Sequence, residues 1–225
     1  MSRSPFLRAL AGETLATPPI WLMRQAGRYL PEYRALRAQA GGFVDLCLTP
    51  EMAAEVTLQP IRRYGFDAAI LFSDILMVPY GLGRELRFEE GRGPILEPIA
   101  DRSEVPAFDP DGFHSAVGPV YETVARVRAA LAPETALIGF AGAPWTVASY
   151  MVEGGSSRDF AKLKLWAYRD PDGFGALIDV LVDATVEYLD RQVGAGAQVV
   201  KLFDSWAGAA PETQFERWVV RPTAE

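Results

Sequence analysis

The sequence predicts an α/β fold in which parallel strands alternate with helices, as in a (β/α)8 barrel. Three near-continuous apolar runs, at residues 66–76, 136–146 and 197–208, have the composition of parallel strands covered on both faces. Long stretches with helical spacing of apolar residues separate these runs. Polar residues gather at the ends of the first and third runs, and in (β/α) barrels the chemistry occurs at that end of the strands.

The first long helix is predicted over residues 50–64. Thr49 is a suitable N-cap, and Pro50 suits the first helical position because its missing N–H is not needed there. Pro60 is expected to kink or end this helix, because proline cannot donate to the helical hydrogen-bond ladder.

A two-stranded ribbon is predicted over residues 84–99, turning at 91–93, where two glycines flank an arginine. Two further helices are predicted over 111–132 and 171–193. Their apolar faces carry Val117, Val120, Val124, Val127 and Leu131 in the first, and Leu177, Ile178, Leu181, Val182, Ala184, Val186 and Leu189 in the second.

The three barrel-type strands are too few for a closed barrel, which needs eight strands and about 250 residues. After the third strand comes one more helical stretch, "PETQFERWVVRPTAE". The sequence therefore predicts either the N-terminal part of a barrel or an open sheet.

Composition and charge exclude several function classes. The 225 residues carry a net charge of −7, which argues against non-specific binding of nucleic acid, and no apolar run approaches the roughly 20 residues of a membrane span. The first residues lack the apolar core of a secretory signal. The single cysteine, Cys47, excludes an intramolecular disulfide. These features predict a cytoplasmic protein with no membrane or nucleic-acid partner.

The stretch "MRQAGRYLPEY" (23–33) places Arg24 and Arg28 where helical spacing would make them repel. Gly27 weakens such a helix, and Pro31 cannot continue one. We therefore predict a loop that leads into a helix beginning at Pro31. Glycine beside arginine lets backbone N–H groups approach an anion, and guanidinium groups bind carboxylates in pairs. The alternative is a solvated basic turn.

Longer motifs around this stretch resemble the uroporphyrinogen decarboxylase family of haem biosynthesis. "PPIWLMRQAGRYLPEYR" (18–34) is similar to the N-terminal motif of that family. "FSDIL" (72–76), "GAPWTVASYMVEGG" (142–155) and "KLFDSWAG" (201–208) follow in the order of the family. The resemblance spans almost the whole chain and implies one incomplete TIM-barrel domain over residues 1–225.

The resemblance implies a substrate, uroporphyrinogen III, which is a flexible cyclic tetrapyrrole with eight carboxylates. The family removes the four acetate carboxyls to give coproporphyrinogen III, uses no metal or organic cofactor, and works as a homodimer. It also implies that Asp74 is the carboxylate that accepts hydrogen bonds from the pyrrole N–H groups. In addition, we expect Asp74 to lie on one face of the first strand with Phe72 and Ile70, pointing into the barrel.

The remaining site residues follow from the same resemblance. Arg24 and Arg28 match the arginines that bind substrate carboxylates. Together with Asp74 they form the implied catalytic set. The substrate-binding set implied for this chain is Arg24, Gln25, Ala26, Gly27, Arg28, Arg37, Phe72, Asp74, Tyr150, Phe203 and Ser205. For Asp74 a helix cap or surface carboxylate remains an alternative, and for Tyr150 an ordinary core tyrosine.

We predict no catalytic role for the single histidine or the single cysteine. His114 is incidental in a helical stretch, and Cys47 is a small buried apolar residue. One histidine and one cysteine cannot form a His/Cys zinc site. This argues against related methyltransferases that use zinc and corrinoid.

The sequence departs from the family in one respect. Members continue through more strands and end with a histidine-containing strand that contacts the substrate, and neither is present here. A fragment that binds anionic tetrapyrroles without turning them over therefore remains an alternative.

Overall fold

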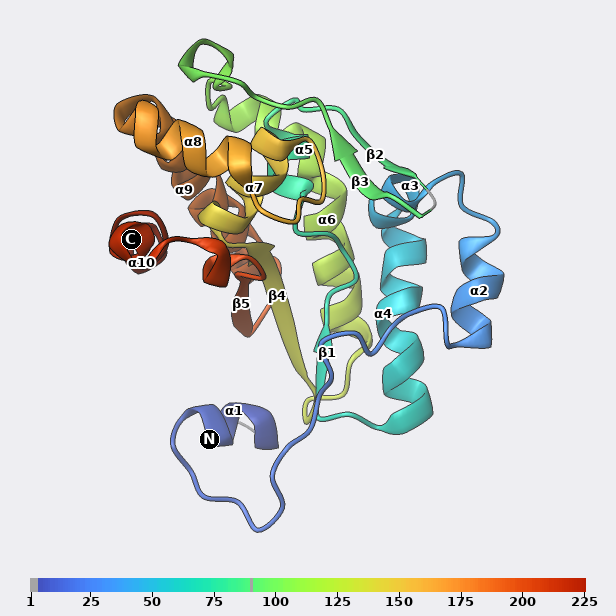
Figure 1. Cartoon of the computed structure of the whole chain (residues 1–225). Coiled ribbons are helices and arrows are strands. Elements are labelled where there is room, and N and C mark those ends of the chain that lie inside the picture. The colour runs from blue at the N-terminus through green and yellow to red at the C-terminus, as the bar shows by residue number, and fades with distance from the viewer. Residues whose placement is uncertain (1–3, 90) are drawn as a thin grey trace. The chain divides into compact units, whose positions relative to one another are not determined.

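The computed structural model describes residues 4–89 and 91–225, which divide into two compact units (Figure 1). The first unit contains residues 4–74, 118–140 and 190–201, and the second contains 75–89, 91–117, 141–189 and 202–225. Several elements pass from one unit into the other along the chain. No helix among the described residues is long and apolar enough to cross a membrane.

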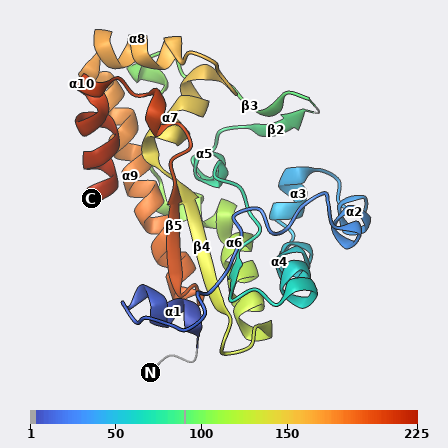
Figure 2. The ribbon, with the colours of Figure 1, turned by 60° about the horizontal axis from the view of Figure 1, so that its bottom comes forward.

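The three predicted barrel strands form one sheet in the order β1-β4-β5, with β4 in the middle (Figures 1 and 2). They are β1 (Ala68–Ile70), β4 (Ala136–Gly142) and β5 (Val199–Phe203). β1 and β4 are parallel, with Ala68 opposite Ala136 and Ile70 opposite Ile138. The predicted parallel pairing of the first two strands is confirmed.

β1 is much shorter than the predicted run of residues 66–76, because the ladder is interrupted. The Leu71 N–H still donates to the Ile138 carbonyl at 2.9 Å, but the Phe72 N–H turns to the Thr57 hydroxyl, at 2.9 Å. The prediction that Asp74 shares a strand face with Ile70 and Phe72 is therefore wrong. Asp74 lies in the non-strand segment that follows β1.

Four short or medium helices precede β1 in the first unit: α1 (Pro5–Leu10), α2 (Pro31–Arg37), α3 (Phe43–Cys47) and α4 (Pro50–Tyr64). α2 and α3 both contact α4, and α4 contacts β1 (Figure 1). Between them Leu30, Tyr33, Leu46 and Val56 form a buried apolar cluster. This cluster fixes α2, and with it the end of the arginine loop, against α3 and α4.

The helix over residues 50–64 is confirmed with its predicted bounds. Thr49 occupies the N-cap position, but its hydroxyl donates to the Asp45 carbonyl at 2.7 Å and makes no cap hydrogen bond. Pro60 does not end the helix, which continues for one more turn to Tyr64. The helix ends at Gly65, whose left-handed backbone (φ 64°) favours glycine.

The two long helices α6 (Pro110–Ala130) and α9 (Pro171–Gly194) also match their predictions closely. All the predicted apolar positions of the first are buried. In α9 the prediction fails at Val186, which is 52% exposed. Thr185 lies on the buried face of α9. Val186 is the next residue along the helix, so its side chain points away from that face.

Near the end of α9, Gln192 is fully buried and bonds to the backbone of β4. Its Oε1 accepts from the Phe140 N–H at 2.9 Å, and its Nε2 donates to the Phe140 carbonyl at 3.0 Å. Both polar groups of a buried strand residue are thereby satisfied by one side chain.

The second unit holds the remaining elements. The predicted ribbon is present as β2 (Leu86–Glu89) paired antiparallel with β3 (Gly93–Leu96). The other elements are α5 (Met77–Gly81), η1 (Arg102–Glu104), α7 (Pro144–Glu153), α8 (Ala161–Arg169), η2 (Ala207–Ala209), α10 (Glu212–Phe215), η3 (Glu216–Val220) and α11 (Arg221–Ala224). The last three form the predicted C-terminal helical stretch, with a π-helical turn at η3.

Candidate functional site

The loop that carries Arg24 and Arg28 is attached to the start of β1. The buried side chain of Gln25 donates from Nε2 to the Ala68 carbonyl at 3.1 Å. Earlier in the loop, the Ile20 N–H donates to the Asp67 carboxylate at 2.7 Å, and the Asp67 N–H donates back to the Ile20 carbonyl at 3.0 Å. The loop and the helix that begins at Pro31 are as predicted.

Hydrogen bonds within the loop determine which backbone amides remain available. The Gln25 N–H donates to the Leu22 carbonyl at 3.2 Å, and the Leu22 N–H donates to Gln25 Oε1 at 3.2 Å. The Tyr29 hydroxyl donates to the Gln25 carbonyl. Gln25, Ala26 and Gly27 are in the implied substrate-binding set, and of their backbone N–H groups that of Gln25 is therefore engaged. Those of Ala26 and Gly27 have no acceptor among the described residues.

The guanidinium groups predicted to bind carboxylates have no partner in the described part of the chain. Arg24 and Arg28 are exposed and Arg37, on α2, is partly exposed, and none of the three donates to a protein acceptor there. Neighbouring arginines differ: Arg34 donates to the Arg28 carbonyl at 2.7 Å, and Arg63 forms a two-pronged ion pair with Glu32. The protein thus engages Arg34 and Arg63 and leaves Arg24, Arg28 and Arg37 open to an anion.

Asp74 and Arg37 both lie near the buried thiol of Cys47. Burial raises the pKa of Cys47 well above its usual value, the negative charge of Asp74 raises it further, and Arg37 lowers it. Burial likewise raises the pKa of Tyr33, which the positive charges of Arg37 and Arg28 lower. Arg37 therefore lies near both Tyr33 and Cys47, whereas Arg28 lies near Tyr33 and Asp74 lies near Cys47.

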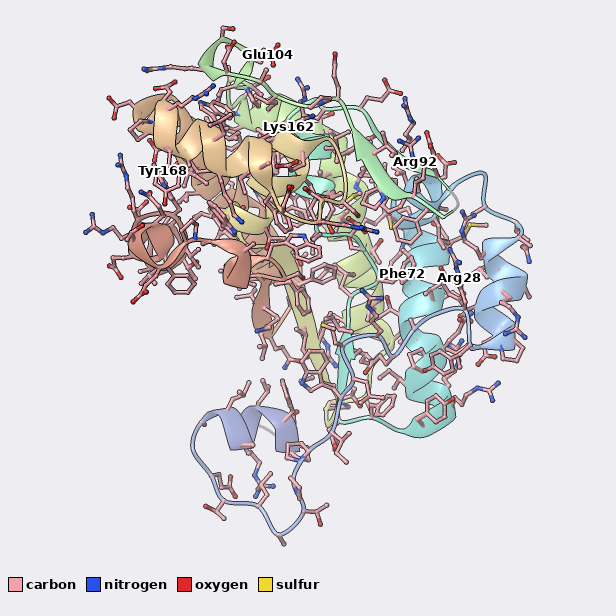
Figure 3. All side chains as sticks on the ribbon, viewed as in Figure 1. Arg28, Phe72, Arg92, Glu104, Lys162 and Tyr168 are labelled. Atoms are coloured by element: carbon pink, nitrogen blue, oxygen red, sulfur yellow. The ribbon has the colours of Figure 1, made fainter. Side chains whose placement is uncertain are left out.

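Aromatic rings pack around Phe72, and the hydroxyl of Thr57, on α4, holds the backbone of Phe72. The half-buried ring of Phe72 packs edge-on against Tyr33 and against Phe43, both at 5.8 Å. Figure 3 labels Phe72 on the segment after β1 and Arg28 in the loop before α2. The buried Thr57, which accepts from the Phe72 N–H, anchors the segment two residues before Asp74.

The other predicted site residues belong to the second unit. Tyr150, on α7, is half-buried, and its ring lies 6.3 Å from that of Trp206. Phe203 ends β5, and its carbonyl accepts from the Ala143 N–H at 2.9 Å, next to the start of α7. Ser205 follows and is exposed. The end of β5 and the helix α7 therefore bring these three residues to one region.

Sequence reasoning passed over Asp204, which stands between Phe203 and Ser205. Its Oδ1 accepts from the Thr146 hydroxyl at 2.6 Å. Burial raises the pKa of Asp204, and the hydrogen bond from Thr146 opposes this rise. The signal was present in the "FDSW" motif, where this carboxylate is adjacent to two residues already in the predicted site.

The remaining candidates play structural parts. Cys47 is buried, as predicted. His114, on α6, lies with Nε2 3.3 Å from the Glu187 carboxylate of α9. The described residues contain no group of three or more His, Cys, Asp or Glu side chains arranged to hold a metal ion.

We predict that Gln25→Leu destabilises the chain by about 1–3 kcal/mol, because it leaves the buried Ala68 carbonyl and the Leu22 N–H without their partner. Urea unfolding followed by circular dichroism measures the change, with the exposed Gln39→Leu as the matched control. Equal unfolding midpoints for Gln25→Leu and the wild type would show that the loop is not held by this side chain.

The chain is similar to known proteins along its whole length. The family model described as "Uroporphyrinogen decarboxylase (URO-D)" matches residues 1–225. A curated protein of Rhodospirillum rubrum, named uroporphyrinogen decarboxylase, is 60% identical over 221 residues. Another of that name, from Chelativorans sp., is 58% identical over 225 residues. These matches cover 98% and 100% of this chain but only 64% and 66% of the relatives, so the chain spans about two thirds of their length.

A solved structure confirms the fold. A methyltransferase from Methanosarcina mazei superposes with a TM-score of 0.72 at 21% identity, covering 96% of this chain and 63% of the other. At this identity the likeness concerns the architecture alone. With the family match, it assigns the chain to the α/β class and to the N-terminal part of a (β/α)8 barrel.

Proposed function

The chain belongs to the uroporphyrinogen decarboxylase family, and from this premise we propose that it acts in the decarboxylation of uroporphyrinogen III to coproporphyrinogen III. The curated relatives bear the name of that activity. The proposal for this chain rests in addition on the chemistry of its own residues.

The observation that carries the proposal is a set of unpaired arginines, one of which, Arg37, lies near the same buried thiol as Asp74. Arg24 and Arg28 share one loop, and Arg28 and Arg37 act on the same tyrosine. Their guanidinium groups have no acceptor in the described part of a chain whose net charge is −7. Guanidinium groups bind carboxylates in a bidentate manner, so this set suits a substrate with many carboxylates.

Besides cations that bind carboxylates, this chemistry requires a negative charge near the pyrrole ring, and in our proposal Asp74 supplies it. Decarboxylation breaks the bond between the acetate methylene and its carboxyl carbon, CO₂ leaves, and the bonding pair passes toward the pyrrole ring. A ring that has taken up a proton from solvent accepts that pair. A second proton from solvent then turns the methylene into a methyl group and the ring returns its own proton, so one proton is consumed for each CO₂. A carboxylate near the ring nitrogens stabilises the positive charge of the protonated ring. In our proposal the carboxylate of Asp74 accepts hydrogen bonds from the pyrrole N–H groups, and the ring of Phe72 borders the macrocycle.

The residues of the second unit have complementary parts in the proposal. No described residue accepts from or donates to the Tyr150 hydroxyl, which can donate to a substrate carboxylate, and Ser205 is exposed and can do the same. Phe203 offers an apolar surface. No step needs a metal or an organic cofactor, because the substrate's own pyrrole ring serves as the electron sink.

Anaerobic incubation with uroporphyrinogen III, followed by chromatography of the products, tests the proposal. We expect coproporphyrinogen III to accumulate through intermediates with seven, six and five carboxylates. Binding of the substrate without any product would favour the alternative, a chain that binds anionic tetrapyrroles but does not turn them over. The absence of both would overturn the proposal.

We further propose that the chain works as a homodimer in the cytoplasm. Ile20, Leu22 and Met23, just before Arg24, are each more than half exposed and offer apolar surface for a second copy. Light scattering after size exclusion measures the mass in solution. A mass of one chain at micromolar concentration would contradict the dimer.

A further inference from the structure

The hydrogen-bond ladder between β1 and β4 ends before β4 does. The Ala136 N–H donates to the Asp67 carbonyl at 3.0 Å. Farther along, the Leu71 N–H donates to the Ile138 carbonyl at 2.9 Å. Alternate residues of a strand bond to the same neighbour in a parallel pair, so the next residue of β4 to face β1 is Phe140. β4 continues beyond this residue and is buried along its whole length, so the ladder does not end because the strand does.

Two fully buried side chains take over the backbone groups at this point. On β4, Gln192 accepts from the Phe140 N–H at 2.9 Å and donates to the Phe140 carbonyl at 3.0 Å, so both groups that would face β1 are already paired. Phe72 follows Leu71, and its N–H therefore points to the opposite edge of β1. There it donates to the Thr57 hydroxyl, on α4, at 2.9 Å.

The segment after β1 is therefore held by α4 and not by the sheet. Asp74 follows Phe72 by two residues, a span of at most about 7 Å of chain, so the place of the Phe72 backbone limits where the carboxylate can lie. The ring of Phe72 packs 5.8 Å from those of Tyr33 and Phe43. The negative charge of Asp74 raises the pKa of Cys47, on the same short helix as Phe43, which agrees with this placement.

On the basis of the proposed function, in which the carboxylate of Asp74 faces the pyrrole nitrogens, we propose that Thr57 and Gln192 are positioning residues for Asp74. Gln192 takes the place of β1 as the partner of β4, and Thr57 ties the released segment to α4. Neither residue has to touch the substrate, and all the groups involved belong to the first unit. Position matters here, because a displacement of about 1 Å can lower a rate about 10²-fold.

The arginine loop is attached elsewhere, which separates the two parts of the site. Gln25 donates to the Ala68 carbonyl, near the start of β1. The hydroxyl of Thr57 makes its hydrogen bonds with Phe72 and with the Ala53 carbonyl, and in the described part of the chain none goes to that loop. Loss of this hydroxyl should therefore impair the carboxylate that stabilises the transition state and leave carboxylate binding by the loop intact.

The first test measures kcat and substrate affinity of Thr57→Val under anaerobic conditions. Valine has nearly the volume of threonine but can neither accept from Phe72 nor donate to Ala53. We expect kcat to fall about 10- to 100-fold, with the dissociation constant for uroporphyrinogen III changed less than about threefold. Thr57→Ser, which keeps the hydroxyl, should recover most of the lost kcat.

Thr123→Val is the matched control. Thr123 is a buried threonine on α6, in the first unit, and its hydroxyl donates to the Pro119 carbonyl at 2.9 Å, as that of Thr57 does to the Ala53 carbonyl at 2.8 Å. Among the described residues, no backbone N–H donates to Thr123. The control loses the same bond within its helix, so it should keep wild-type kcat. Urea unfolding of both variants shows whether each remains folded.

A double-mutant cycle with Asp74→Asn separates positioning from a general structural role. If Thr57 acts through Asp74, Thr57→Val should lower kcat much less in the Asp74→Asn background, because the charge that it positions is already absent. Gln192→Met removes both hydrogen bonds to Phe140 and should show the same dependence on Asp74. It also tests the inference from β4 if Thr57→Val does not fold.

Amide hydrogen exchange gives a readout that does not depend on turnover. Exchange of the Phe72 N–H should be faster in Thr57→Val than in wild type and unchanged in Thr123→Val. Unchanged exchange in a folded Thr57→Val chain would overturn the part assigned to Thr57.

The outcomes distinguish the inference from the function on which it rests. Wild-type kcat in a folded Thr57→Val chain, or an equal loss of kcat with and without the carboxylate of Asp74, would overturn the positioning role and leave the decarboxylase proposal standing. Absence of turnover in the wild-type chain itself would overturn the proposed function, and the positioning role with it.

Discussion

Asp74→Asn is expected to reduce turnover by at least about 10²-fold and to leave the chain folded. The amide keeps the size of the carboxylate but loses the negative charge that would stabilise the positive ring of the transition state. Removal of one such electrostatic stabiliser costs other enzymes about 10²- to 10³-fold. Since this interaction strengthens as charge develops, the loss should appear mainly in kcat.

The control for this substitution is Asp190→Asn, which changes an exposed aspartate at the end of α9. Urea unfolding of Asp74→Asn should check that folding is intact, because Asp74 lies close to the buried Cys47. The same variant should also raise the thiol pKa of Cys47 less than the native aspartate does, since its negative charge is gone. Turnover of Asp74→Asn equal to that of the control would refute its assignment.

Arg24→Ala is expected to weaken binding of uroporphyrinogen by about 2–5 kcal/mol, which is about 30-fold or more in the dissociation constant. Arg24 is exposed and has no acceptor among the described residues, so its removal should barely affect stability. Arg24→Lys should recover part of the affinity, because the charge returns but the two-pronged geometry does not.

Anaerobic equilibrium titration of the intact chain with uroporphyrinogen measures this effect. Arg191→Ala, which removes an exposed arginine on α9, is the matched control and should bind as the wild type does. Added salt should weaken the wild-type complex more than the Arg24→Ala complex, because salt screens the charge pair that the variant lacks. Equal affinities of the two alanine variants would contradict the anion-binding role of Arg24.

The order of strands and helices followed from local patterns in the sequence. Long helices with regular apolar spacing, such as residues 50–64 and 110–130, were predicted within one or two residues of their observed bounds. The loop before Pro31 was also predicted, because proline and glycine constrain the backbone whatever surrounds them. The family motifs supplied the candidate site residues themselves.

What the sequence alone determined, then, is the α/β alternation and the longest helices, because these depend on contacts between residues near one another in the chain, together with the identity of the motif residues. Tertiary structure decided where β1 ends. The Phe72 N–H donates to the hydroxyl of Thr57, fifteen residues earlier, and not to a neighbouring strand. It also decided that Gln25 attaches the arginine loop to β1 and that Thr146 orients Asp204. Such hydrogen bonds join side chains to groups 43 or 58 residues away, and no local pattern encodes that distance.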